Sequence, residues 1–300
     1  MKSCARVFFF CVFATLAAWG AERPLVAILG AYPPELVALR RDFRVDAKDS
    51  GFVTTTVKGV RFDRGVVGGR EVVIFQAGPS VVNAAYQLQM ALDHFPITHV
   101  LFAGVAGGID PALDVGDVVI PEKWAYHSEA AYLNEDGKGG YVRPDYLRPA
   151  GLENFGMMFP DGVRAIRDGL EKAESIMAFP IDAEMLAVAR KAIAKLPAIK
   201  KAGRTVAVSV GGTGVSGPVF LDNAKYREWV FRVWQARCLD MESTAYAHVC
   251  WANRKPLLVI RGLSDLAGGQ HGKNPIDANE LTVSGIATKV LLAVLDEMPK

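Results

Sequence analysis

The chain has 300 residues, of which 51% are hydrophobic, and its 34 lysines and arginines nearly balance its 32 aspartates and glutamates. An evenly charged chain without a basic run is a poor candidate for binding nucleic acid or an acidic membrane surface. No linker and no internal repeat interrupts the sequence. We therefore expect a single globular domain, over residues 24–297.

The first twenty residues have the layout of a secretory signal peptide. Lys2 and Arg6 give a positive start, residues 7–14 are apolar, and Ala18-Trp19-Gly20 places small residues at the cleavage positions. The apolar stretch is shorter than the roughly 20 residues that span a membrane. We expect residues 1–20 to be cleaved, leaving a periplasmic or secreted protein without a membrane attachment. An uncleaved N-terminal anchor is the alternative.

Predicted strands and helices alternate along the rest of the chain. Apolar or Val- and Thr-rich runs predict strands at 25–30, 52–57, 59–65, 71–76, 98–103, 116–121, 205–210 and 256–262. Helical spacing and capping residues predict helices at 33–41, 81–94, 181–196, 223–234, 242–251 and 279–295. Residues 130–200 are less regular and include a glycine-rich turn at 134–140. This alternation indicates an α/β fold, with a mainly parallel sheet covered on both faces by helices.

Cysteine and histidine usage argues against a metal centre. After cleavage of the predicted signal peptide only Cys238 and Cys250 remain, and we expect buried free thiols in preference to a disulfide. The five histidines show no paired spacing with each other or with cysteine. We predict no metal site and no cofactor.

Four short motifs fall at predicted strand ends, where α/β folds bind their ligands. They occupy residues 30–35, 103–108, 240–243 and 261–265. Each has a structural alternative. The glycine cluster of the second could form a tight turn, Glu35 could answer a helix dipole, and Asp240 or Asp265 could cap a helix.

Together, and in this order, the motifs resemble the nucleoside phosphorylase/nucleosidase superfamily, most closely its 5′-methylthioadenosine/S-adenosylhomocysteine nucleosidase branch. The segment 216–223 is similar to the base-stacking segment of that family. The sequence of this segment, together with the insertion at about 130–200, also resembles plant storage-protein relatives of the family. The resemblance implies a three-layer α/β/α phosphorylase/hydrolase-like fold with a mixed sheet. It also implies a purine nucleoside as the small-molecule ligand, and a homodimer.

The chemistry of such an enzyme suits three acidic residues. Breaking a ribose–purine bond places negative charge on the base, which a buried and protonated carboxyl can neutralise. Asp265, at the end of a buried strand and next to Ser264, is the candidate acid. By resemblance, Glu35 activates the attacking water, and Glu242 accepts hydrogen bonds from the ribose hydroxyls.

The resemblance also assigns the apolar walls of the site. Phe220 would stack on the purine, with the Leu221 backbone at the purine edge, and Met241 would pack on the sugar. Small residues at Ala106 and Gly107 would let the backbone approach the ligand. Tyr32 and Pro79 would lie near the 5′-substituent.

Hydrolysis is favoured over phosphorolysis by charge. A phosphorylase normally holds phosphate with arginine, yet the loops 30–35 and 76–80 contain neither Arg nor Lys. Glu35 would repel phosphate. Two alternatives stay open: a phosphorylase that uses Arg40, Arg41 or Arg261, and a non-catalytic storage or binding protein. The joint presence of all three acidic residues argues against the second.

Overall fold

The computed structural model describes residues 24–147 and 151–299. The predicted signal peptide lies outside the described residues. The helices are α1 (Pro33–Asp42), α2 (Val81–His94), α3 (Ala183–Lys195), α4 (Ala224–Trp234), α5 (Ser243–Asn253) and α6 (Ile276–Glu297). The strands of the main sheet are β1 (Leu25–Gly30), β2 (Val53–Val57), β3 (Val60–Val67), β4 (Arg70–Gln76), β5 (Ile97–Gly108), β6 (Val118–Ile120), β7 (Lys123–Tyr126), β12 (Phe179–Pro180), β15 (Val208–Val210), β16 (Thr213–Ser216), β17 (Ala236–Asp240) and β18 (Leu257–Asp265).

These strands form one mixed sheet in the order β12-β7-β16-β17-β5-β1-β4-β3-β2. In addition β18 pairs with β5, β6 pairs with β18, and β15 pairs with β6. The central pairings of β4, β1, β5 and β18 are parallel, whereas β17 runs antiparallel to β5. The strand β1 is buried along its whole length, as its continuous apolar run predicts for a central parallel strand.

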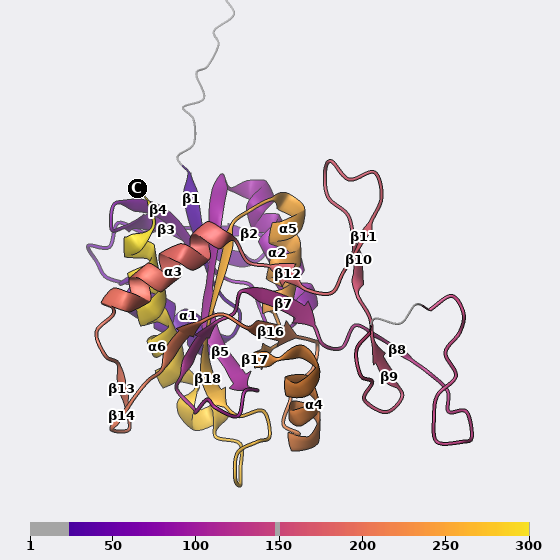
Figure 1. The fold of residues 1–300 in the computed structure, drawn as a ribbon. Coiled ribbons are helices and arrows are strands. Elements are labelled where there is room, and N and C mark those ends of the chain that lie inside the picture. Colours follow the sequence, from indigo (N-terminus) through magenta and orange to yellow (C-terminus); the bar gives the residue numbers. More distant parts are fainter. Residues whose placement is uncertain (1–23, 148–150, 300) are drawn as a thin grey trace, which may run out of the picture.

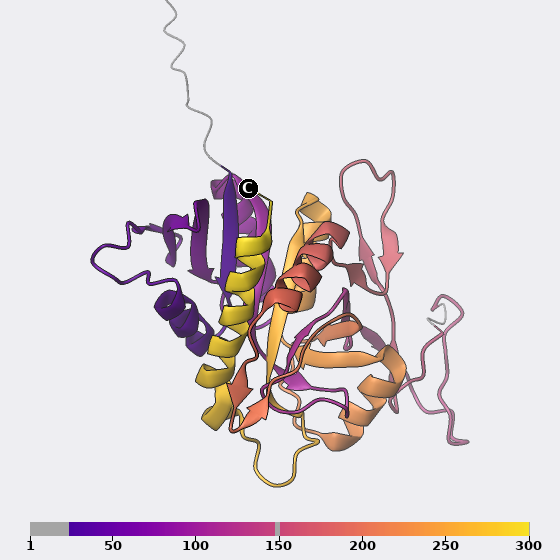
Figure 2. The same cartoon turned by 60° about the vertical axis from the view of Figure 1, so that its left-hand side comes forward.

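Helices cover both faces of the sheet, as Figures 1 and 2 show. Helices α1, α3 and α6 pack together on one face, and α2 and α5 pack together on the other. The expected three-layer α/β/α architecture with a mixed sheet is confirmed. Helix α6 is long and apolar enough to cross a membrane, but 56% of its most apolar window is buried. Its contacts with α1, α3 and β18 make it a core helix of this domain.

Residues 130–147 and 151–176 lie beside the sheet and include small hairpins that project from the body (Figure 1). They are β8 (Ala130–Tyr132) with β9 (Met158–Pro160), and β10 (Val163–Ala165) with β11 (Glu174–Ile176). The chain then rejoins the main sheet, since β12 pairs with β7 and β15 pairs with β6. The glycine-rich segment 134–140, predicted as a turn, forms bends next to an isolated bridge between Glu135 and Tyr141.

The structure corrects three details of the predicted elements. Residues 104–108 continue strand β5 instead of forming a turn, because β17 and β18 pair with its two edges. The predicted strand 205–210 is divided into β14 (Arg204–Thr205), which pairs with β13 (Lys200–Lys201), and β15. It breaks where the Ala207 amide turns to donate to the Asp117 carboxylate. Strands β16 and β17 were not expected at all. Cys238 and Cys250 are buried and unpaired, as predicted.

Candidate active site

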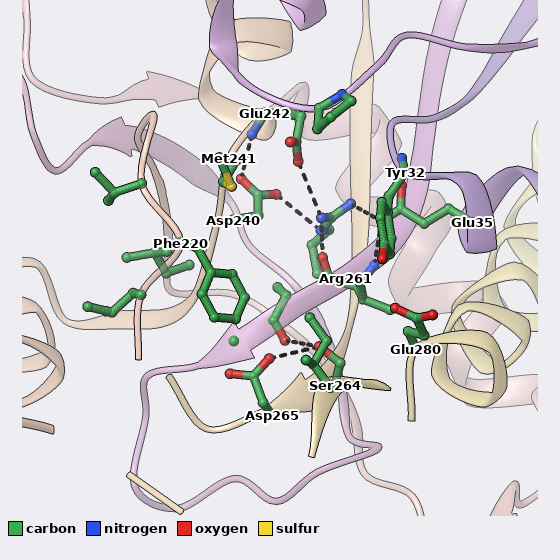
Figure 3. A pocket seen from close by; sticks show the side chains of 18 of the residues that line it. Tyr32, Glu35, Phe220, Asp240, Met241, Glu242, Arg261, Ser264, Asp265 and Glu280 are labelled. Atoms are coloured by element: carbon green, nitrogen blue, oxygen red, sulfur yellow. Dashed lines mark hydrogen bonds and ion pairs between the residues drawn. The ribbon is translucent and has the colours of Figure 1, made fainter. Parts of the chain in front are cut away.

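The motifs converge on one cavity of about 290 Å³, between the ends of β1, β4, β5, β17 and β18 and the start of α6. Figure 3 shows its lining side chains. Every residue that the sequence assigns to the site lines this cavity; the set is Tyr32, Glu35, Pro79, Ala106, Gly107, Phe220, Leu221, Met241, Glu242, Ser264 and Asp265. The structure therefore brings all of them together, while their chemical roles stay predictions.

A buried arginine organises one side of the cavity. The Arg261 guanidinium forms ion pairs with Glu35 at 3.4 Å, Asp240 at 3.1 Å and Glu242 at 3.7 Å. It also lies 4.3 Å from the centre of the Phe102 ring and donates to the Val105 carbonyl. A charge this deeply buried requires opposite charges around it. The three carboxylates supply these opposite charges, so the positive charge of Arg261 is compensated inside the protein.

Glu35 is fixed in this cluster by backbone amides. Its carboxylate accepts hydrogen bonds from the amides of Ala31 at 2.7 Å, Tyr32 at 3.0 Å and Val105 at 2.8 Å. The first two contacts belong to the start of α1, as the helix-dipole alternative expects, but the side chain is also only 1% exposed and lines the cavity. A Cβ at Gly104 would lie 1.9 Å from the Glu35 carboxylate. Glycine is required there because the carboxylate rests on the backbone of β5.

Asp240 and Glu242 divide two tasks between them. Asp240 accepts from the Ser216 hydroxyl at 2.5 Å and from the Ser243 amide at 3.1 Å, so it holds the first residue of α5 as well as pairing with Arg261. Glu242 accepts from the Ser80 amide at 2.8 Å and faces the cavity. Burial, and then the charge of Asp240, raise the pKa of Glu242, while Arg261 opposes that rise.

Asp265 lies on the other side of the cavity from this cluster (Figure 3). Its carboxyl is 2% exposed and accepts from the Ala267 amide at 2.8 Å and the Ser264 hydroxyl at 2.9 Å. Burial raises its pKa, and these two donors oppose the rise. A Cβ at Gly107 would lie 3.2 Å from this carboxyl, so glycine keeps the space beside the acid open. A carboxyl with a raised pKa is suited to donate a proton.

Phe220 is the aromatic surface of the cavity. It follows β16 in the loop before α4, and its ring faces the cavity near Asp265 and away from Tyr32 and Glu35 (Figure 3). The ring is 58% exposed, whereas the next residue, Leu221, is buried. A large exposed ring beside a cavity offers a face on which a planar ligand can stack.

The sequence does not predict two features of the cavity. One is the wall formed by the start of α6, which we call the entrance wall, and the other is the set of ion pairs made by Arg261. Ile276, Asp277 and Glu280, from the first turns of α6, line the cavity together with Tyr32. The Glu280 carboxylate is the largest cause of the raised pKa of the Tyr32 hydroxyl. No local motif marks these residues, because they follow a ten-residue loop. Arg261 was considered only for phosphate, although an arginine inside an apolar strand signals a buried ion pair.

The three-layer fold thus places a buried acid, Asp265, across one cavity from a cluster of carboxylates. A family model described as "Phosphorylase superfamily" matches residues 25–298, and the chain belongs to this superfamily. The 5′-methylthioadenosine/S-adenosylhomocysteine nucleosidase of Geobacillus kaustophilus is 30% identical over 247 residues, covering 82% of this chain and 86% of that relative. The enzyme of the same name from Colwellia psychrerythraea is 31% identical over 245 residues, covering 80% and 83%.

Solved structures agree in fold. A Helicobacter pylori nucleosidase of the same name, with butyl-thio-DADMe-Immucillin-A, has a TM-score of 0.69 at 21% identity, covering 92% of this chain and 99% of that one. The Helicobacter pylori futalosine hydrolase also has a TM-score of 0.69, at 20% identity and with coverage of 92% and 98%.

Proposed function

We propose that the protein hydrolyses the N-glycosidic bond of a purine nucleoside such as 5′-methylthioadenosine or S-adenosylhomocysteine and releases adenine. The observation that carries this proposal is the cavity itself. A buried acid, Asp265, lies beside an aromatic stacking face, and two carboxylates, Glu35 and Glu242, lie across from it. This is what a nucleoside needs when its base departs and its sugar becomes cationic.

The reaction assigns one task to each carboxyl. As the bond between the sugar C1′ and the purine N9 breaks, its electron pair moves to the base, and Asp265 donates a proton to N7. Glu242 accepts hydrogen bonds from the ribose hydroxyls, and its ionised form, which Arg261 favours, stabilises the oxocarbenium-like sugar. Water then adds to C1′ and gives a proton to Glu35. The products are the free base and the free sugar.

Charge in the cavity favours water over phosphate as the acceptor. Within the described residues, Arg261 is the only cationic side chain that lines the cavity, and three carboxylates already pair with it. The two other arginines that kept phosphorolysis open lie elsewhere in ion pairs, Arg40 with Asp46 and Asp63, and Arg41 with Asp42. A phosphate dianion would meet excess negative charge and no free cation.

The entrance wall selects the 5′-substituent. With the base at Phe220 and the ribose at Glu242, the remaining lining residues are Tyr32, Pro79 and the start of α6, including Asp277 and Glu280. This wall is acidic. It accommodates a neutral thioether or an ammonium group and repels a 5′-phosphate.

Incubation with methylthioadenosine, adenosylhomocysteine, adenosine and inosine, with and without phosphate, tests the proposal. Free sugar in the absence of phosphate supports it. Sugar 1-phosphate that appears only with phosphate would establish a phosphorylase instead. Absence of turnover with every substrate would favour the storage or binding protein.

Two further proposals concern the setting of the enzyme. Export to the periplasm or the medium rests on the charge, hydropathy and cleavage pattern of residues 1–20. A homodimer rests on the family resemblance. Cell fractionation with N-terminal sequencing of the mature protein tests the first, and light scattering of that protein tests the second.

A further inference from the structure

The loop that carries Phe220 is held at its two ends. It comprises residues 217–223, between β16 and α4, and we call it the Phe220 loop. In the part of the chain that the structure describes, no hydrogen bond between backbone groups involves residues 218–221. The first amide of the loop donates to the Asp240 carbonyl at 3.3 Å, and the last amide donates to the Ala267 carbonyl at 3.2 Å. The place of the Phe220 ring therefore depends on what fixes these ends.

His127 contacts the start of the Phe220 loop and the helix that follows it. It comes directly after β7, which is parallel to β16, and its side chain is fully buried. A hydrogen bond of 2.8 Å joins its Nδ1 to the hydroxyl of Tyr226, in the first turn of α4. Its Nε2 lies against the start of the loop, because a Cβ on Gly217 would fall 2.6 Å from that atom. One ring thus connects the two ends of the loop.

Packing alone does not account for a histidine at this place. Burial lowers the pKa of His127 to about 4, so the ring is neutral and one of its nitrogens carries a hydrogen. Among the described residues, Nε2 has no hydrogen-bond partner. A buried polar atom without a partner costs free energy that an apolar side chain avoids. What histidine adds over leucine is the hydrogen bond to Tyr226.

We propose that His127 is a positioning residue for the purine-stacking face, which it holds in place by bonding to Tyr226 and supporting Gly217. The inference rests on the proposed function, in which Phe220 stacks on the departing base. His127 is not among the residues that line the cavity. It acts through the loop whose ends it connects.

Three variants separate the hydrogen bond from packing. His127→Leu fills the space without a polar atom, His127→Asn keeps an amide that can bond to Tyr226, and Tyr226→Phe removes only the hydroxyl. At pH 7, KM should rise about 3- to 10-fold in His127→Leu and in Tyr226→Phe, and less than twofold in His127→Asn. In all three, kcat should stay within twofold, because stacking is present before and during bond breaking.

Stability should follow a different order from KM. The melting temperature of His127→Leu should equal or exceed that of the native protein, since the unpartnered nitrogen is gone and the Tyr226 hydroxyl still donates to the Met158 sulfur at 3.8 Å. His127→Asn should melt lower, because the smaller side chain leaves a cavity. The double variant of His127→Leu and Tyr226→Phe should have the KM of either single variant, since both remove the same bond. Tyr86→Phe, at an exposed tyrosine of α2 that does not line the cavity, is the control and should keep the native KM.

A KM that rises without the bond and returns with asparagine supports the proposal. An unchanged KM in His127→Leu, or equal rises in His127→Leu and His127→Asn, would overturn it and leave His127 as a packing residue. Calorimetric binding of adenine to the same variants separates this inference from the proposed function. If the unmodified protein binds adenine but cleaves no nucleoside, only the proposed function fails, and the order of the adenine Kd values decides about His127. An unmodified protein that does not bind adenine would refute both.

Discussion

Replacing Asp265 with asparagine tests the central chemical assignment. The side chains have the same shape, and the asparagine oxygen can still accept the Ala267 amide, while its NH₂ group can donate to the Ser264 hydroxyl. Only the transferable proton is lost. A general acid contributes about 10²–10⁴-fold to the rate, so kcat/KM should fall by that factor, or about 3–5.5 kcal/mol of transition-state stabilisation.

Stability should respond in the opposite sense. Burial raises the pKa of Asp265 above its value in the unfolded chain, so the native protein loses stability as pH rises from the unfolded pKa through the folded one. Asparagine does not titrate and escapes this loss. The free energy of unfolding of the variant should therefore equal that of the native protein near pH 4 and exceed it at pH 8.

Two measurements decide the matter. Adenine release is followed by absorbance at saturating and subsaturating nucleoside, and unfolding is followed by urea titration at several pH values. Asp296→Asn, at an exposed aspartate of α6, serves as the control and should change neither quantity. An Asp265→Asn variant with half of the native kcat/KM would show that another group protonates the base.

Three other changes have distinct signatures. Glu35→Gln should lower kcat about 10²–10⁴-fold, and it should lower unfolding stability by about 1–3 kcal/mol because one amide oxygen replaces a carboxylate that serves three donors; an unchanged kcat would exclude Glu35 as the base. Phe220→Ala should raise KM about 5- to 150-fold through lost stacking, with an unchanged melting temperature because the ring is exposed; an unchanged KM would place the purine elsewhere. Arg261→Met should cost about 3–5 kcal/mol of stability, since it leaves buried carboxylates without a cation. Arg261 lowers the pKa of Glu242, so its removal raises that pKa further, and the loss measured by urea unfolding should be smaller at pH 5 than at pH 8; an equal loss at both would contradict this.

The acids of the site were predictable because each belongs to a local pattern. Glu35 lies in the first turn of the helix that follows one buried strand. Glu242 lies at the start of another helix, and Asp265 is the last residue of a different apolar strand. Carboxyl ends of neighbouring strands meet at one edge of a sheet. Strand assignment was therefore enough to expect Glu35 and Asp265 in one place. Glu242 follows β17, which the sequence does not predict, and only the family resemblance adds it to them.

Other parts depend on contacts that no local pattern reveals. Strand β17 has the sequence Ala-Arg-Cys-Leu-Asp and becomes a strand because it pairs with β16 and, antiparallel, with the glycine end of β5. Those glycines suggested a turn, whereas they are needed because Glu35 and Asp265 lie against the backbone. Tertiary pairing overrode local preference in both cases.

Carboxyl side chains on the two sides of the cavity are held in different charge states. Those on one side surround a cation, and the one on the other side is favoured in its protonated form. Around Arg261, three carboxylates share one positive charge, which holds Glu35 and Glu242 in place and leaves no free cation for phosphate. At Asp265 the nearby groups are neutral donors and a like charge, Asp222, so burial raises the pKa and favours the protonated form. In the proposed reaction, a bond broken between these two sides places its developing negative charge next to Asp265, the proposed proton donor, and its developing positive charge next to the carboxylates. The separation of charge in the cavity thus matches the separation that the proposed reaction requires.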